Sequence, residues 1–122
     1  MLPDADRVRL QHMLDAACSA MGFALGRRRE DLGTDEMLTF ALVRALEVIG
    51  EAAGRVSEQA RQSLPQIAWA EIVGMRNRLV HAYFDVDLSR VWDTTTQYVP
   101  ELAKQLETIL RSAPPPRSAG DH

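Results

Sequence analysis

Residues 67–84 read IAWAEIVGMRNRLVHAYF, and this stretch is the strongest indication of the fold. On a helix that turns about 100° per residue, its apolar side chains fall into two adjacent strips. The first strip is Ile72, Met75, Leu79 and Ala82, and the second is Val73, Val80 and Phe84. Two apolar strips are more than a helix on the surface of a monomer needs. The stretch therefore predicts a helix inside a bundle, with its second strip available to another subunit.

Two helices are predicted before this stretch. The first is capped by Asp4 or Asp6 and carries apolar side chains at helical spacing as far as Leu25. The second starts at Thr34, before two acidic residues that suit a helix N-terminus, and reaches Val56 with a bent extension beyond it. Small residues in the second helix would let a neighbouring helix approach closely; they are Gly50, Ala52, Ala53 and Gly54.

One helix is predicted after the stretch, with Asp87 as its N-cap and an apolar stripe that runs to Leu110. Pro100 falls inside that stripe and should kink or split the helix. Because no segment alternates as a strand does, we expect an all-α, up-and-down bundle of four to five helices over residues 1–112. The Pro-rich residues 113–122 have almost nothing to bury and are expected to form a disordered tail.

Composition and charge restrict the classes of function. A hydrophobic content of 46% predicts a folded domain. The net charge of −3 disfavours general binding to nucleic acid, so RNA would need a local basic patch. Candidates for such a patch are residues 27–29, Arg76 and Arg78. The single cysteine, Cys18, lies in an apolar pattern and is expected to be buried, and no disulfide can form within the chain. Because neither a membrane span nor a signal peptide is apparent, we expect a cytoplasmic protein.

The segment from Arg76 to Tyr83 holds the one cluster of side chains that suggests chemistry. Arginine keeps its charge and can stabilise phosphate, and histidine can exchange a proton near neutral pH. Arg76 and His81 are therefore candidates for cutting or holding a phosphodiester. The sequence has no cysteine and histidine pairs at zinc-ligand spacing, and carboxylates do not cluster around the motif. Acid–base chemistry without a metal or cofactor is the better fit.

A purely structural interpretation of the same residues is also open. His81 would then be solvated, and Arg76 would pair with a carboxylate, for which Glu47, Glu51 and Asp85 are available. On an ideal helix Arg76 and His81 are about 140° apart. They can serve one phosphate only if the arginine reaches around, the helix distorts, or another subunit completes the site.

The run RNRLVHAY at residues 76–83 matches the Arg-x4-His-x-Tyr motif of HEPN-domain proteins. Together with ALEVIGEAAGRVSE at residues 45–58 and the segment 65–110, it resembles the HepT-like toxins of HepT/MntA toxin–antitoxin pairs. The resemblance implies an all-helical homodimer in which the motif helices of both subunits line a shared cleft. It also implies a metal-independent ribonuclease that is toxic to its own cell.

The resemblance assigns a role to each position of the motif. It makes Arg76 and His81 the catalytic pair and Asn77 the polar residue between them. Tyr83 would accept AMP from a small nucleotidyltransferase antitoxin of the MntA type, which would silence the enzyme. Arg78 is a further candidate contact for RNA.

Two hypotheses follow for the function. In the first, two copies of His81 flank one scissile phosphate as base and acid, and Arg76 neutralises the developing charge. In the second, the chain is a catalytically silent HEPN subunit that binds nucleotide or a nucleotidyltransferase. The acidic net charge favours the second modestly, and an RNA-cleavage assay in the presence of a chelator separates the two.

Overall fold

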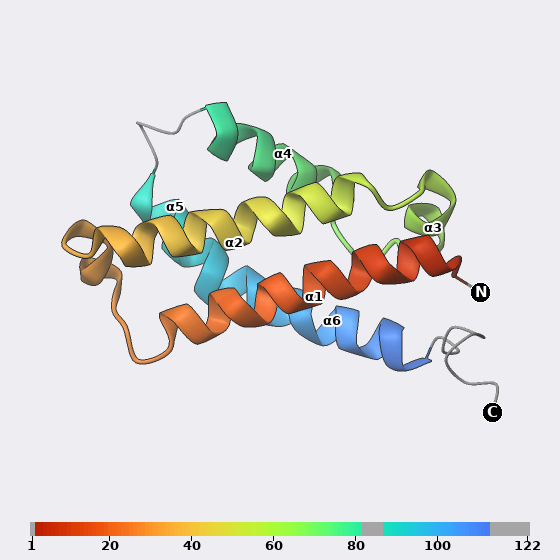
Figure 1. The fold of residues 1–122 in the computed structure, drawn as a ribbon, viewed down its shortest axis with the longest axis horizontal. Coiled ribbons are helices and arrows are strands. Elements are labelled where there is room, and N and C mark those ends of the chain that lie inside the picture. The colour runs from red at the N-terminus through yellow and green to blue at the C-terminus, as the bar shows by residue number, and fades with distance from the viewer. Residues whose placement is uncertain (1, 82–86, 113–122) are drawn as a thin grey trace.

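The computed structural model of the chain describes residues 2–81 and 87–112, apart from the side chains of residues 79–81. Every regular element within these residues is helical, which confirms the predicted all-α fold (Figure 1). The elements are α1 (Asp4–Ala24), the 3-10 helix η1 (Arg29–Gly33), α2 (Glu36–Gly54), α3 (Glu58–Ser63), α4 (Trp69–His81), α5 (Leu88–Asp93), the π-helical turn η2 (Thr94–Tyr98) and α6 (Val99–Ser112). The predicted tail at 113–122 lies outside the described residues.

Side-chain caps explain where three of the helices begin. Asp35 accepts a hydrogen bond from the backbone N–H of Leu38 at 3.1 Å, so Asp35 is the N-cap and α2 begins at Glu36, two residues after the predicted start at Thr34. Asp87 accepts from the backbone N–H of Arg90 at 3.1 Å, which confirms its predicted role. Ser57 caps the short α3 in the same way. Each cap satisfies a backbone donor that the first turn of a helix leaves unpaired.

The start of α1 differs from the prediction, because Pro3 occupies the cap position and both Asp4 and Asp6 lie inside the first turn. The buried Asp6 has a different partner. Its carboxylate accepts from the backbone N–H of Ser57 at 2.8 Å and from the hydroxyl of Ser57 at 2.7 Å. Residue 6 therefore ties the beginning of α1 to the cap of α3.

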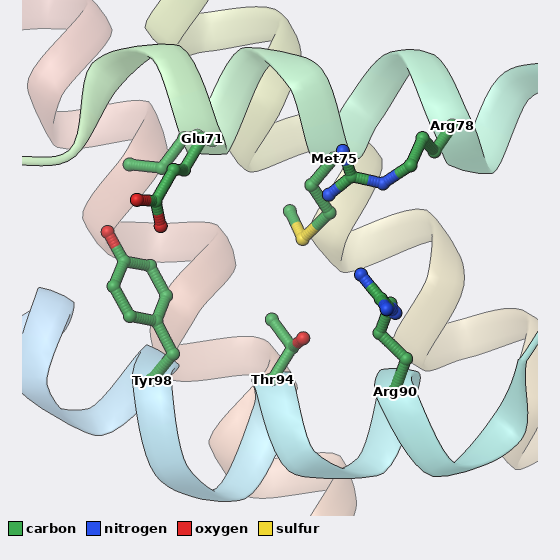
Figure 2. Close-up of a pocket in the computed structure, with 7 residues that line it drawn as sticks. Glu71, Met75, Arg78, Arg90, Thr94 and Tyr98 are labelled. Atoms are coloured by element: carbon green, nitrogen blue, oxygen red, sulfur yellow. The ribbon is translucent and has the colours of Figure 1, made fainter.

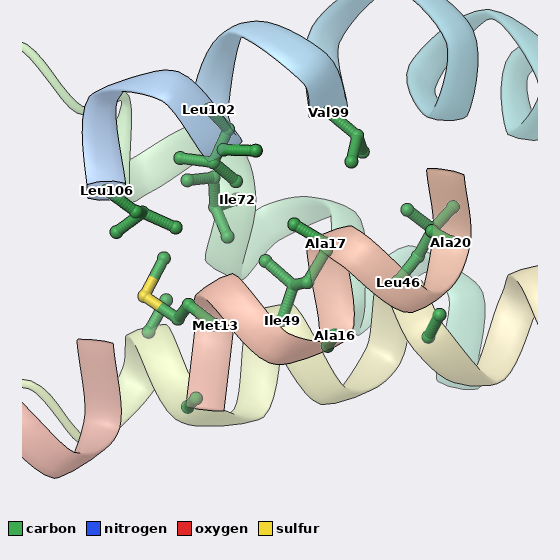
Figure 3. Packing of buried hydrophobic residues seen from close by; sticks show 14 of the residues in the cluster. Met13, Ala16, Ala17, Ala20, Leu46, Ile49, Ile72, Val99, Leu102 and Leu106 are labelled. Carbon is green, nitrogen blue, oxygen red and sulfur yellow. The ribbon is translucent and has the colours of Figure 1, made fainter. Parts of the chain in front are cut away.

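The core lies where α1, α2, α4 and α6 meet. In Figure 1, α2 runs between α4 on one side and α1 and α6 on the other. Figure 3 shows side chains from all four helices pointing into this space, among them Met13, Ile49, Ile72 and Leu102. Each of these is at most 2% exposed, so the four helices form one hydrophobic core.

Pro100 was expected to kink or split the last helix, and it does not split it. Residues 88–112 continue without interruption through α5, η2 and α6. The backbone N–H of Val99 donates to the carbonyl of Thr94, five residues earlier, so the turn before the proline is widened. Since proline lacks an N–H and clashes with the carbonyl four residues before it, a wider turn lets the helix continue.

Two expectations for the end of α1 are wrong. Cys18 is exposed rather than buried. The apolar stripe ends at Ala20, because α1 ends at Ala24 and Leu25 is 82% exposed beyond it. The buried face of α1 includes Met13, Ala17 and Ala20, so Cys18 lies on the other side of the helix, and Leu25 lies beyond its last turn.

Of the arginines at residues 27–29, Arg27 has its charge matched by carboxylates and Arg29 is hydrogen-bonded to a hydroxyl. Arg27 pairs with Asp31 at 3.5 Å and with Asp35 at 2.5 Å. Arg29 donates to the hydroxyl of Ser89 at the start of α5. These contacts hold the connection between α1 and α2 in place and leave the arginines of α4 as the nearer candidates for an anion.

Candidate active site

The first half of α4 is fixed against the rest of the bundle. Ile72 is 2% exposed and contributes to the core. The indole N–H of Trp69 donates to the carbonyl of Leu64 at 3.0 Å, and the guanidinium of Arg61 lies 6.0 Å from the centre of the Trp69 ring. The motif therefore begins on a helix whose N-terminal turns are held rigidly.

Arg76 lies where α4 comes closest to α2. A Cβ placed on Gly50 of α2 would lie 2.2 Å from the Cβ of Arg76, 2.8 Å from its Cγ and 3.3 Å from the carbonyl oxygen of Ile72. No side chain larger than hydrogen fits there without a shift of one helix. Gly50 thus sets the depth at which Arg76 sits, and of the small residues predicted to allow close approach it is the one that does so at the motif.

The guanidinium of Arg76 is partly buried and only partly paired. One of its terminal nitrogens donates to the side-chain oxygen of Asn77 at 3.3 Å. Its Nε is buried and has no hydrogen-bond partner within the described part of the chain. A buried donor without an acceptor costs about 1–3 kcal/mol. That donor would gain free energy if an anion reached it.

The predicted carboxylate partners of Arg76 on α2 are engaged elsewhere. Arg44 lies 3.0 Å from a carboxylate oxygen of Glu51 and 3.8 Å from one of Glu47. Between the described side chains, no ion pair joins Arg76 to either glutamate. Asp85, the third candidate, lies outside the described residues. The structural interpretation of Arg76 as one half of an ion pair is therefore not supported on the α2 side.

The remaining motif residues differ in how much of them is described. Asn77 and Arg78 are exposed. His81 is the last residue of α4, one helical turn after Asn77, and its side chain lies outside the described residues. Tyr83 lies outside them altogether. The roles assigned to His81 and Tyr83 therefore remain predictions.

Arg90 is a residue near the motif that the sequence did not single out. It lies on α5 and lines a cavity together with Arg78 and Tyr98 (Figure 2). Burial raises the pKa of the Tyr98 phenol, and the negative charge of Glu71 raises it further. The phenol is therefore neutral at physiological pH and offers its hydroxyl as a hydrogen-bond donor.

Membrane-spanning helices and clusters of metal ligands are both absent from the part of the chain that the structure describes. None of the helices could cross a lipid bilayer. No three histidine, cysteine, aspartate or glutamate side chains lie together as a set of metal ligands within residues 2–81 and 87–112.

Comparison with protein families gives a match to the family described as Ribonuclease HepT-like, over residues 13–109. The match includes all of α2 and α4 and the motif between residues 76 and 83.

Several curated proteins are similar over most of their length. "Putative RNase TTE0752" of Caldanaerobacter subterraneus subsp. tengcongensis is 38% identical over 105 residues, which cover 86% of this chain and 94% of that protein. "Putative RNase MJ1216" of Methanocaldococcus jannaschii is 34% identical over 102 residues, or 84% of each chain. "Probable ribonuclease HepT" of Thermococcus cleftensis is 39% identical over 82 residues, or 67% of this chain and 74% of that protein. No solved structure gave a significant match.

Proposed function

Because this chain belongs to the HepT-like ribonuclease family, we propose that it is a metal-independent endoribonuclease and the toxin of a toxin–antitoxin pair. It cuts RNA by acid–base transesterification in a cleft between two subunits. Arg76 and His81 are its catalytic residues, and Asn77 orients one of them.

The observation that carries this proposal is the state of Arg76. Its Cβ and Cγ lie against Gly50, its Nε is buried and has no partner among the described residues, and no glutamate of α2 pairs with it. An arginine with a structural role would have its charge matched by a neighbouring acid. The described residues provide no such acid for Arg76, which supports a role in meeting an anion from outside, and the phosphate of RNA is that anion.

The reaction uses the nucleophile that RNA itself carries. A base removes the proton of the 2′-hydroxyl, and the 2′-oxygen attacks phosphorus. The bond from phosphorus to the 5′-oxygen breaks, and an acid gives that oxygen a proton. The products are a 2′,3′-cyclic phosphate and a 5′-hydroxyl. Arg76 stabilises the extra negative charge that the phosphorane carries, as a preorganised donor aimed at developing charge.

Two proton transfers require two acid–base groups, whereas each chain supplies one histidine in the motif. A two-fold dimer brings a second copy of His81 to the same phosphate. The dimer also solves the geometric problem within one helix, where Arg76 and His81 point about 140° apart. Two copies of each residue can then surround one phosphate from different directions.

Tyr83 provides the means of control. A nucleotidyltransferase antitoxin of the MntA type transfers AMP from ATP to the Tyr83 hydroxyl and releases pyrophosphate, which adds a negative charge and a nucleotide two residues after His81. The RNA phosphate is then repelled and sterically excluded. Tyr83→Phe should keep the ribonuclease activity and should no longer gain the mass of AMP when the chain is co-expressed with its antitoxin.

The test is cleavage of a labelled RNA by the purified chain in excess chelator. Wild-type protein should cleave, and His81→Ala should lose about 10²–10⁴-fold in rate. The rate per chain should also fall on dilution, in step with the fraction of dimer measured by sedimentation. A wild-type protein that leaves RNA intact would favour the catalytically silent HEPN subunit, and a His81→Ala variant at full rate would remove the mechanism.

A further inference from the structure

A cavity of about 260 Å³ lies between α4 and the helical segment formed by α5 and η2. Figure 2 shows how its ends differ. Arg78 and Arg90 lie at one end and Glu71 and Tyr98 at the other, with Met75 between them. The cavity is lined by Glu71, Ile72, Met75, Arg78, Arg90, Thr94 and Tyr98.

The two arginines extend toward each other from facing helices (Figure 2). Arg78 bends back along α4, so that one terminal nitrogen would lie 3.6 Å from a Cβ placed on Gly74. Within the described residues, neither arginine forms an ion pair with a carboxylate. Two guanidinium groups that face each other without an anion repel, and an anion between them would turn the repulsion into attraction. Phosphate suits them best, because the planar guanidinium binds its oxygens in pairs.

The cavity continues the path of the candidate active site. Arg78 is two residues after Arg76 and three before His81 on the same helix. On an ideal helix Arg78 is about 200° from Arg76 but only about 60° and about 4.5 Å along the axis from His81, so it lies on the side of α4 that would carry His81. The chain as a whole has a net charge of −3, so RNA needs local positive charge, and the arginine pair supplies it beside the motif.

We propose that Arg78 and Arg90 together bind a phosphate of the RNA substrate other than the scissile one. By binding it they set the register of the strand over the active site. This inference rests on the proposed function. The negative charge of Glu71 disfavours a second phosphate at the far end, so the attached nucleoside lies there, against the ring of Tyr98 and the side chain of Met75.

The size of the cavity favours one phosphate of a strand over a free nucleotide. Pockets that enclose small ligands usually measure about 300–1,000 Å³, and this cavity is smaller. It can hold a phosphate and part of a nucleoside while the rest of the strand continues along α4.

The experiment measures binding without cleavage. A fluorescein-labelled 2′-O-methyl oligoribonucleotide, which has no free 2′-hydroxyl, is titrated with the full chain and followed by anisotropy. Arg78→Gln and Arg90→Gln should each weaken binding about 3–10-fold. Because they share one phosphate, the double variant should lower the salt slope by about 0.7, the value for one contact on a single strand. Arg111→Gln, on the exposed last turn of α6, is the matched control and should bind as the wild type does.

Two further measurements exclude other roles for the pair. Inorganic phosphate should raise the Tm of the wild type more than that of Arg90→Gln. In its absence, Arg90→Gln should not lower the Tm, since it removes one of two like charges. A fall of several degrees would make Arg90 a structural residue and overturn the inference. AMP binding as tightly as the oligonucleotide would also overturn it, by making the cavity a site for a mononucleotide.

The outcomes separate this inference from the proposed function. If the wild type does not cleave RNA but binds the oligonucleotide, and the two variants bind it more weakly, the nuclease is wrong and the phosphate site stands. If the wild type cleaves and both variants bind like the control, the phosphate site is wrong and the nuclease stands.

Discussion

Replacing Gly50 with alanine should reduce RNA cleavage far more than it reduces stability. The new methyl group would lie 2.2 Å from the Cβ of Arg76, about 1.2 Å closer than an ordinary contact of 3.4 Å. Both atoms are close to their backbones, so rotating a flexible side chain cannot relieve the overlap. Either α2 or α4 must move, and Arg76 moves with the contact.

The expected changes follow from that displacement. Alanine gains about 1 kcal/mol over glycine in helix propensity, and overpacking a core costs about 1–3 kcal/mol. The net loss of stability should therefore be about 0–2 kcal/mol, measured by urea denaturation. A catalytic group misplaced by about 1 Å can lose 10²-fold in rate. We expect about a 100-fold lower cleavage rate in a protein that is still folded.

Gly54→Ala is the matched control on the same helix. A Cβ on Gly54 meets nothing within 4 Å, so this variant should cleave at the wild-type rate with equal or slightly higher stability. Wild-type cleavage by Gly50→Ala would refute the reasoning, because it would show that the depth of Arg76 over α2 does not matter.

Three other predictions concern the fold that holds the site. Asp6→Ala should lose about 1–3 kcal/mol in urea denaturation, because it removes the hydrogen bonds that the buried Asp6 carboxylate accepts from the N–H and hydroxyl of Ser57; unchanged stability would contradict this. Asp87→Ala should lose about 1 kcal/mol through its N-cap, and Asp87→Asn, which can still cap, should lose much less. The side-chain hydrogen bond from Arg27 lowers the pKa of Asp35 below its ordinary value, and the backbone N–H of the cap adds to this effect. The stability from this pair is present above about pH 4 and is lost as the pH falls through the lowered pKa. Between pH 7 and 2.5 the Tm of Arg27→Gln should therefore fall less than the Tm of the wild type. An equal fall in both proteins would count against the linkage.

The sequence predicted the helices because periodicity and capping are local properties. Asp87 caps its helix as expected, and Ile72 and Met75 of the predicted stripe pack in or against the core. The end of α1 could not be predicted in this way. Helical spacing continues to Leu25, but which face of α1 is covered depends on where the neighbouring helices pack, and Cys18 lies off that face while Leu25 lies beyond the end of the helix.

The candidate site was predicted in part for the same reason. The spacing of Arg76 and His81 is visible in one segment, and so is the run of small residues around Gly50. That Gly50 lies directly beneath Arg76 depends on how α2 and α4 pack together. Arg90 had no signal of its own, since its connection with Arg78 exists only where α5 faces α4.

The central claim is that the guanidinium of Arg76 stabilises the charge that develops when RNA is cut. Its most direct test is the single-turnover rate of cleavage of a defined oligoribonucleotide in excess chelator, by wild type, Arg76→Ala and Arg111→Ala. We predict that Arg76→Ala is slower by about 10²–10³-fold and still folded, and that Arg111→Ala is unchanged. A rate for Arg76→Ala within twofold of the wild type would contradict the account.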